Sequence, residues 1–136
     1  MNMEIRADLS TAEREVLKAL WELGTGTVRQ VNTLLNDWGK RWAYTTVLTL
    51  LQRLQAKGYV VSDSSGVAHV FSPTMSRDEM LERRLKDTAD ELCGGSAAPL
   101  VLALVSGNRF TPEEIARFRR LLDEAGAGGD GVPSKS

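Results

Sequence analysis

The sequence predicts a mostly α-helical protein with one small β-hairpin. Four segments begin with Ser or Thr and carry Glu or Gln three residues later, a capping-box pattern in which side chains satisfy the free N–H groups at a helix N-terminus. These pairs are Ser10/Glu13, Thr27/Gln30, Ser76/Glu79 and Thr111/Glu114. A β-prone stretch lies between residues 59 and 71. The length of 136 residues, of which 42% are hydrophobic, allows one ordinary core or two small ones.

Three short helices are predicted before residue 58. The first ends near Leu23, where Gly24 follows; the second covers residues 28–36; the third covers residues 43–57 and is followed by Gly58. Each has apolar side chains at helical spacing, which predicts one buried face per helix. These predicted core positions are Val16, Leu17, Leu20, Trp21, Val31, Leu34, Leu35, Val47, Leu50, Leu51 and Leu54.

After residue 58 the sequence pattern changes from helical to β-prone. Residues 59–62 and 68–71 are β-prone and are joined by Asp, Ser and Gly residues, which favour a turn. Helical patterns follow at 76–93, 97–105 and 112–125, and the end of the chain is rich in Gly and Ser. We therefore predict an N-terminal domain of residues 1–73, a helical region of residues 74–125, and a disordered tail of residues 126–136.

The composition argues against several classes of function. With 17 Lys and Arg against 18 Asp and Glu, the chain has a formal net charge of -1 and is not basic throughout. Its one cysteine, Cys93, and one histidine, His69, form no metal cluster or catalytic pair, so we expect no metal, no cofactor and no enzymatic activity. The polar N-terminus and the lack of a long apolar segment predict a cytoplasmic protein.

The basic charge is concentrated around the third predicted helix. Residues 38–62 contain four cationic side chains and no acidic one, a local charge of +4. The helix face opposite the predicted core is also free of acidic residues and carries Thr45, Thr46, Thr49, Gln52 and Arg53. A solvated helix face usually mixes Glu with Lys, so this composition favours a surface that approaches phosphate.

Three helices followed by a hairpin is the order of a winged helix-turn-helix, whose third helix enters the major groove of DNA. We predict that Thr45, Thr46 and Thr49 contact base edges and that Lys40, Arg41 and Arg53 contact mainly phosphate. A winged helix that binds another protein instead of DNA is the alternative. The absence of carboxylates over 25 residues favours DNA.

Several motifs resemble one known family. The runs LSTAE at 9–13, TVRQV at 27–31, AYTTVLTLLQRL at 43–54 and AHVFSP at 68–73 are similar to the penicillinase-repressor (BlaI/MecI/CopY) family. The resemblance extends more loosely to GGS at 94–96 and to residues near 122. It implies a homodimeric repressor of β-lactamase-type resistance genes that binds an inverted-repeat operator and is released when a sensor protease triggers its cleavage.

The C-terminal helices carry more apolar side chains than three short helices can bury alone, which predicts a homodimer. The expected interface residues are Leu81, Leu85, Leu92, Leu100, Val101, Leu104, Ile115, Phe118 and Leu122. The antibiotic-responsive relatives are cut at an Asn-Phe bond in this region. Here Ala103 and Leu104 stand at the matching positions and form the candidate cleavage region, although the bond differs in type.

The remaining distinctive residues favour structural roles. His69 lies in the predicted hairpin, and Cys93 lacks the paired cysteines of the copper-responsive relatives, so we assign neither to a metal site. Trp38 and Trp42 flank the basic pair, and their sequence context leaves their roles open.

Overall fold

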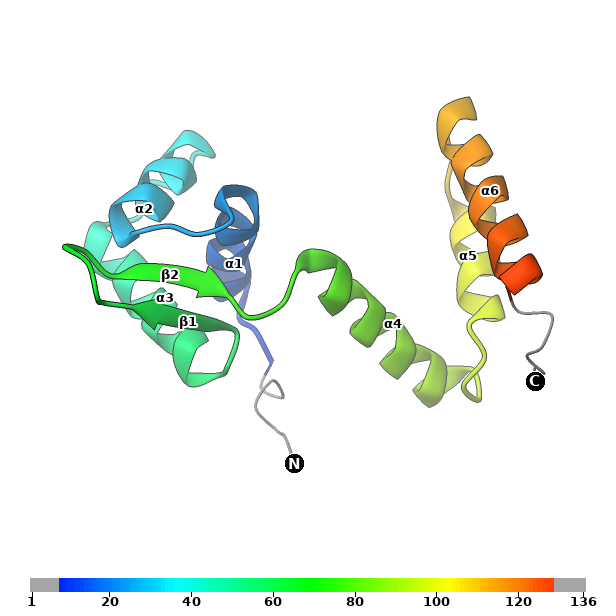
Figure 1. The fold of residues 1–136 in the computed structure, drawn as a ribbon, viewed down its shortest axis with the longest axis horizontal. Helices are drawn as coiled ribbons and strands as arrows, with labels where there is room; N and C mark the ends of the chain where they lie inside the picture. The colour runs from blue at the N-terminus through cyan, green and yellow to red at the C-terminus, as the bar shows by residue number, and fades with distance from the viewer. Residues whose placement is uncertain (1–7, 129–136) are drawn as a thin grey trace. The chain divides into compact units, whose positions relative to one another are not determined.

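The computed structural model describes residues 8–128 and contains the helices and the hairpin in the predicted order (Figure 1). The elements are α1 (Thr11–Leu23), α2 (Val28–Asp37), α3 (Tyr44–Ala56), β1 (Val60–Asp63), β2 (Val70–Pro73), α4 (Arg77–Leu92), α5 (Ala98–Gly107) and α6 (Pro112–Gly128). This order confirms the mostly helical fold with a hairpin wing. The chain divides into two compact units, one up to Leu81 and one from Glu82, so the division falls within α4 rather than at the predicted residue 73.

All four predicted capping boxes are formed. In α1 the hydroxyl of Ser10 accepts a hydrogen bond of 3.1 Å from the backbone N–H of Glu13, and the Glu13 carboxylate accepts one of 2.9 Å from the backbone N–H of Ser10. The same reciprocal pair closes the N-termini of α2, α4 and α6. At the other end of α1, Gly24 adopts a φ of 82°, which a side-chain-bearing residue rarely tolerates.

The first unit has one apolar core. Val16, Leu17, Leu20, Val31, Leu35, Val47, Leu50, Leu51 and Leu54 are all buried there, as predicted. Trp21 and Leu34 pack against this core but are only partly buried. Phe71 of β2 is 2% exposed and extends the core into the wing.

The wing is a two-stranded antiparallel sheet in which Val60 pairs with Pro73 and Asp63 with Val70. Both strands begin later than predicted. The N–H of Tyr59 donates to the Leu54 oxygen at the end of α3, while the Tyr59 oxygen accepts a hydrogen bond from the N–H of Thr74. The wing is also tied to the α1–α2 loop, since Gly26 and Phe71 exchange two backbone hydrogen bonds.

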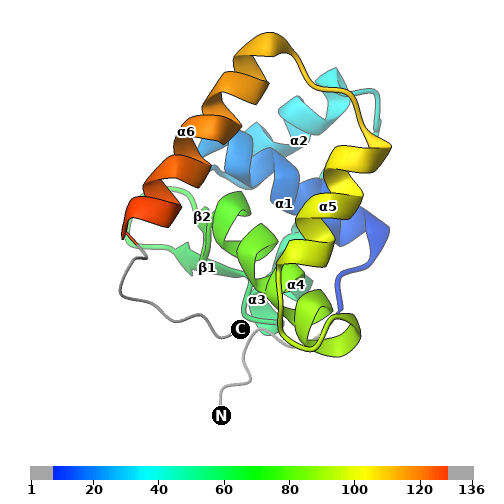
Figure 2. The ribbon, with the colours of Figure 1, turned by 90° about the vertical axis from the view of Figure 1, so that its right-hand side faces the viewer.

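The second unit contains most of α4 together with α5 and α6. Figure 2 shows α5 and α6 running in opposite directions on the two sides of the turn that joins them. Phe110 in this turn and Phe118 of α6 stack edge to face, with ring centroids 5.0 Å apart. No residue of α5 is buried. Helix α6 extends to Gly128, beyond the predicted start of the tail at residue 126, and residues 129–136 of that predicted tail lie outside the described residues. Within residues 8–128, no helix has the length and apolar character that a membrane span requires.

Candidate nucleic-acid interface

Helix α3 has one buried face and one exposed face. The buried face is formed by Val47, Leu50, Leu51 and Leu54. The exposed side chains are Tyr44, Thr45, Thr46, Thr49, Gln52, Arg53, Gln55 and Ala56. None of them is acidic, so the exposed face can approach phosphate without charge repulsion.

The N-terminus of α3 differs from the capped helix starts. Its N-cap residue, Ala43, supplies no side-chain hydrogen bond, so no side chain satisfies the first backbone N–H groups of the helix from that position. Such N–H groups, together with the helix dipole, favour an anionic oxygen. The N-terminus of α3 is thus suited to a phosphate group and adjoins the Thr-rich face.

The loop before α3 is held in an unusual conformation. Arg41 has a φ of 57°, the only positive value at a non-glycine residue between positions 8 and 128, and its side chain is exposed. Backbone and side-chain bonds on both sides hold the loop: Lys40 N–H donates to the Leu35 oxygen, and the Asn32 amide donates to the Trp42 oxygen at 2.9 Å. The loop therefore holds Arg41, with an exposed side chain, three residues before the first residue of α3.

Two of the four cations in this region have carboxylate partners in the protein. The Lys40 ammonium is 3.5 Å from a Glu15 carboxylate oxygen and 6.0 Å from the centre of the Trp42 ring. Glu15 also binds Lys18 at 3.1 Å, and the hydrogen bond from Lys18 is the main reason that the pKa of Glu15 lies below its ordinary value. Part of the local charge counted from the sequence is therefore balanced by α1.

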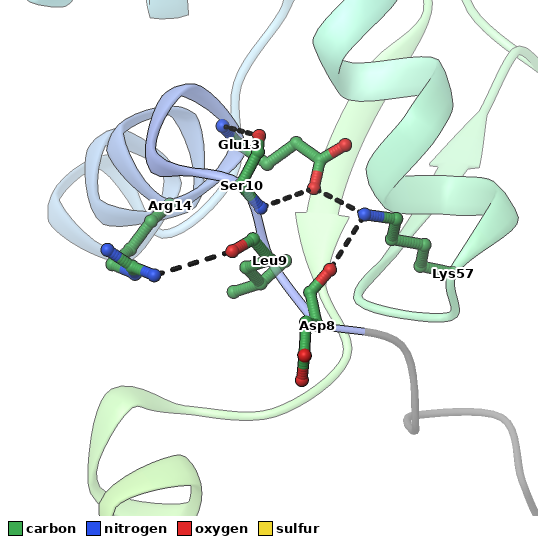
Figure 3. Close-up of polar contacts among 6 residues, drawn as sticks. All are labelled: Asp8, Leu9, Ser10, Glu13, Arg14 and Lys57. Atoms are coloured by element: carbon green, nitrogen blue, oxygen red, sulfur yellow. Dashed lines mark hydrogen bonds and ion pairs between the residues drawn. The ribbon is translucent and has the colours of Figure 1, made fainter.

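Lys57 has a structural partner as well (Figure 3). Its ammonium is 2.6 Å from a carboxylate oxygen of Glu13, which is only 2% exposed, and 2.8 Å from the Asp8 backbone oxygen. Burial raises the pKa of Glu13, but the hydrogen bonds from Lys57 and Ser10 outweigh it and hold the pKa below its ordinary value. Within residues 8–128, Arg41 and Arg53 are the two cations of this region without an ion pair.

The structure thus places Thr45, Thr46, Thr49 and Arg53 on one exposed face, with Lys40 and Arg41 in the loop before it. Two further residues belong to this surface. Gln52 lies one turn beyond Thr49, and Tyr44, at the first position of α3, is 51% exposed. The helical spacing already indicated Gln52, whereas nothing in the sequence pattern indicated Tyr44.

His69 and Cys93 lie outside the α3 surface. His69 is exposed in the wing, with its ring 6.5 Å from that of Phe71, and Cys93 is a partly buried free thiol at the end of α4. The described residues contain no group of three or more potential metal ligands from His, Cys, Asp and Glu.

The expected dimer residues lie on the C-terminal helices. Eight of them are exposed, and Leu100 is partly buried. Ala103 and Leu104 are both exposed within α5.

A three-helix unit with an antiparallel hairpin and an exposed, acid-free third helix defines a winged-helix DNA-binding protein. Comparison with known proteins gives its family. The penicillinase repressor family model matches residues 9–124, and this chain belongs to that family of transcriptional repressors, which are not enzymes. The match confirms the resemblance seen in the sequence motifs.

Three comparisons illustrate the relationship. The transcriptional regulator BlaI of Mycobacterium tuberculosis is 35% identical over 122 residues, which cover 88% of this chain and 86% of the relative. The penicillinase repressor of Bacillus licheniformis is 25% identical over 116 residues, covering 85% and 90% of the two chains. The solution structure of the DNA-binding domain of the repressor BlaI covers 58% of this chain and 93% of that domain, with 26% identity and a TM-score of 0.48.

Proposed function

We propose that the protein is a homodimeric repressor that binds an inverted-repeat DNA operator through the exposed face of α3. The observation that carries this proposal is the acid-free α3 surface, together with Arg53 on that surface and Arg41 in the loop before it, two cations that have no ion pair among the described residues. Because the proposed ligand is DNA, we propose that the protein acts in the cytoplasm.

The surface divides into two kinds of contact. The hydroxyl and methyl groups of Thr45, Thr46 and Thr49 suit base edges in the major groove, including the thymine methyl group. Arg41 and Arg53 suit phosphate oxygens, which fix the register of the protein but carry no sequence information. Lys40 is a weaker phosphate ligand because it must share its charge with Glu15.

A second copy of the chain is the proposed partner of the C-terminal helices. Their apolar side chains are strongly exposed, for example Leu92 at 78%, Leu102 at 65% and Leu122 at 64%. Exposed apolar side chains in such number favour association. A two-fold dimer would place two α3 helices about one or two DNA turns apart, which matches a palindromic operator.

We further propose that the target genes are of the β-lactamase resistance type and that proteolysis relieves repression. The name of the Bacillus licheniformis relative supports the first point. Exposure of Ala103 and Leu104 in α5 supports access for a sensor-controlled protease, although a cut within a helix requires that the helix open locally. Cleavage there would divide the proposed dimer-forming helices and leave each winged helix with one half-site.

Selection of DNA from a random pool by the full-length protein tests this proposal. We expect enrichment of an inverted repeat and protection of both half-sites in footprinting. Enrichment of no sequence, together with binding to a protein ligand through the same α3 surface, would instead establish the protein-interaction alternative.

A further inference from the structure

The segment between β2 and α4 is bonded to the core of the DNA-binding unit. The indole nitrogen Nε1 of Trp21 in α1 donates a hydrogen bond of 3.0 Å to the backbone oxygen of Met75. The backbone N–H of Thr74 donates to the Tyr59 oxygen at 2.9 Å, and the Thr74 hydroxyl donates to the Gly58 oxygen at 2.8 Å. These bonds join the segment both to α1 and to the chain that follows α3.

Apolar contacts reinforce these bonds. Met75 and Met80 are each 9% exposed and belong to the same core cluster as the buried residues of α1, α2 and α3. Met80 lies in the first turn of α4, which the Ser76/Glu79 capping box closes. The start of α4 therefore belongs to the DNA-binding unit, and the rest of α4 continues from it as one helix.

We propose that Trp21, Met75 and Met80 are positioning residues, which set the direction in which α4 leaves the DNA-binding unit and thereby the distance between the two α3 helices of a dimer. This inference rests on the homodimer proposed above. The three residues lie outside the α3 surface, so they would act on the fit of the dimer to two half-sites and not on contacts with either one.

The length of α4 makes its starting direction important. Its 16 residues span about 24 Å at ~1.5 Å per residue, so a tilt of about 10° at the start displaces the far end by about 4 Å. One base pair occupies ~3.4 Å along the DNA axis. If the start of α4 is held less firmly, the spacing between half-sites that the dimer prefers should therefore vary by about one base pair.

The Trp21→Phe variant of the full chain tests the proposal, because it removes the indole N–H and keeps an aromatic ring. Its affinity is measured for selected DNA with one half-site, with both half-sites, and with one base pair added or removed between them. We expect half-site affinity within about twofold of the unmodified protein, and affinity for the two-site DNA lower by about tenfold. The loss of affinity caused by adding or removing one base pair between the half-sites should be smaller in the variant than in the unmodified protein.

Trp38→Phe is the matched control, since Trp38 is 41% exposed and its indole nitrogen has no hydrogen bond within residues 8–128. It should leave the ratio of two-site to half-site affinity unchanged. If Trp21→Phe does not fold, the isosteric Thr74→Val variant, which removes the bond to the Gly58 oxygen, replaces it and should lower the same ratio.

Two results separate failure of this inference from failure of the proposed function. Equal losses on one-site and two-site DNA, or an unchanged ratio in the variant, would overturn the positioning role while leaving the repressor proposal intact. Equal affinity of the unmodified protein for one-site and two-site DNA would overturn the dimeric operator-binding proposal and this inference with it.

Discussion

The ammonium of Lys57 lies 2.6 Å from a carboxylate oxygen of Glu13, and this pair joins the end of α3 to the first turn of α1 (Figure 3). The Glu13 side chain is 3% exposed and the Lys57 side chain 28% exposed. The same carboxylate oxygen accepts the Ser10 backbone N–H, so one oxygen serves both the helix cap and the ion pair. Lys57 therefore stabilises the fold that presents α3.

Replacing Lys57 by Met should destabilise the protein. The variant leaves a buried carboxylate without its cation, at a cost of about 1–3 kcal/mol in the free energy of unfolding. Urea denaturation measures this cost. Lys86→Met is the control, because the Lys86 pair with Asp90 is 3.8 Å long and exposed, and its loss should cost less than ~0.5 kcal/mol. Equal effects of the two substitutions would contradict the structural role of Lys57.

The Glu13 carboxylate should also make stability depend on pH. Its pKa is lowered in the folded protein from an ordinary value of 4.5, so its contribution is present above that pH and is lost as the pH falls through the folded pKa. Denaturation between neutral pH and the acid range measures this loss. Glu13→Gln should be less stable at neutral pH and should show a shallower acid dependence. An unchanged pH profile in this variant would assign the acid sensitivity to other carboxylates.

Much of the fold could be predicted because it depends on local signals. Ser10 and Thr27 with their partners three residues later predicted where α1 and α2 begin, since a capping box is a contact within one turn. The pairing of Glu13 with Lys57 could not be predicted, because 44 residues separate them and only the packing of α3 on α1 brings them together. The +4 charge of residues 38–62 therefore includes two cations, Lys40 and Lys57, that have carboxylate partners in α1.

The candidate surface was predictable to a similar extent. The spacing of the buried leucines in α3 fixed which threonines face outward, because a helix repeats every 3.6 residues. The hydrogen bond from Trp21 to Met75 joins segments 54 residues apart. The positive φ of Arg41 occurs in a loop held by the bonds of Lys40 to Leu35 and of Asn32 to Trp42. The periodic spacing of apolar residues in the sequence does not indicate such contacts.

Removing the Glu15 carboxylate should strengthen DNA binding. In Glu15→Gln, Lys40 loses an anionic partner at 3.5 Å and becomes available to phosphate, so affinity should rise by about twofold on operator and scrambled DNA alike. Fluorescence anisotropy at low salt measures the change. Glu22→Gln alters an exposed carboxylate of α1 that has no ion pair within residues 8–128 and serves as the control. In a double-mutant cycle with Lys40→Ala, the gain should disappear; a gain that persists without Lys40 would refute the coupling.

Truncation after Ala103 should separate dimer formation from DNA contact. The shortened protein keeps the winged helix but loses α6 and the end of α5, so it should sediment as a monomer. Its operator affinity should fall by ~100- to 10,000-fold, because the second half-site no longer binds within the same complex. Half-site affinity should stay unchanged. Undiminished operator affinity at physiological salt would refute release by loss of the dimer.

Substituting the phosphate-contacting Arg53 of α3 should affect DNA binding differently from substituting a base-contacting threonine. Arg53→Ala removes a phosphate contact, so it should weaken binding to all sequences alike and reduce the slope of affinity against salt by about one unit. Measurements at several salt concentrations on selected and scrambled DNA give both quantities. A loss confined to the selected operator would show that Arg53 reads bases.

The most direct test of the account is the ratio of affinities for the selected operator and for scrambled DNA, measured for the unmodified protein and for Thr49→Ala. A specific regulator should prefer its operator by ~1,000-fold or more at physiological salt. Thr49→Ala should lower that preference by about 1–3 kcal/mol in binding free energy, because the alanine cannot pair with a base edge, while binding to scrambled DNA stays nearly unchanged. Equal affinity of the unmodified protein for both DNAs, or a ratio that Thr49→Ala leaves untouched, would contradict sequence reading by the exposed face of α3.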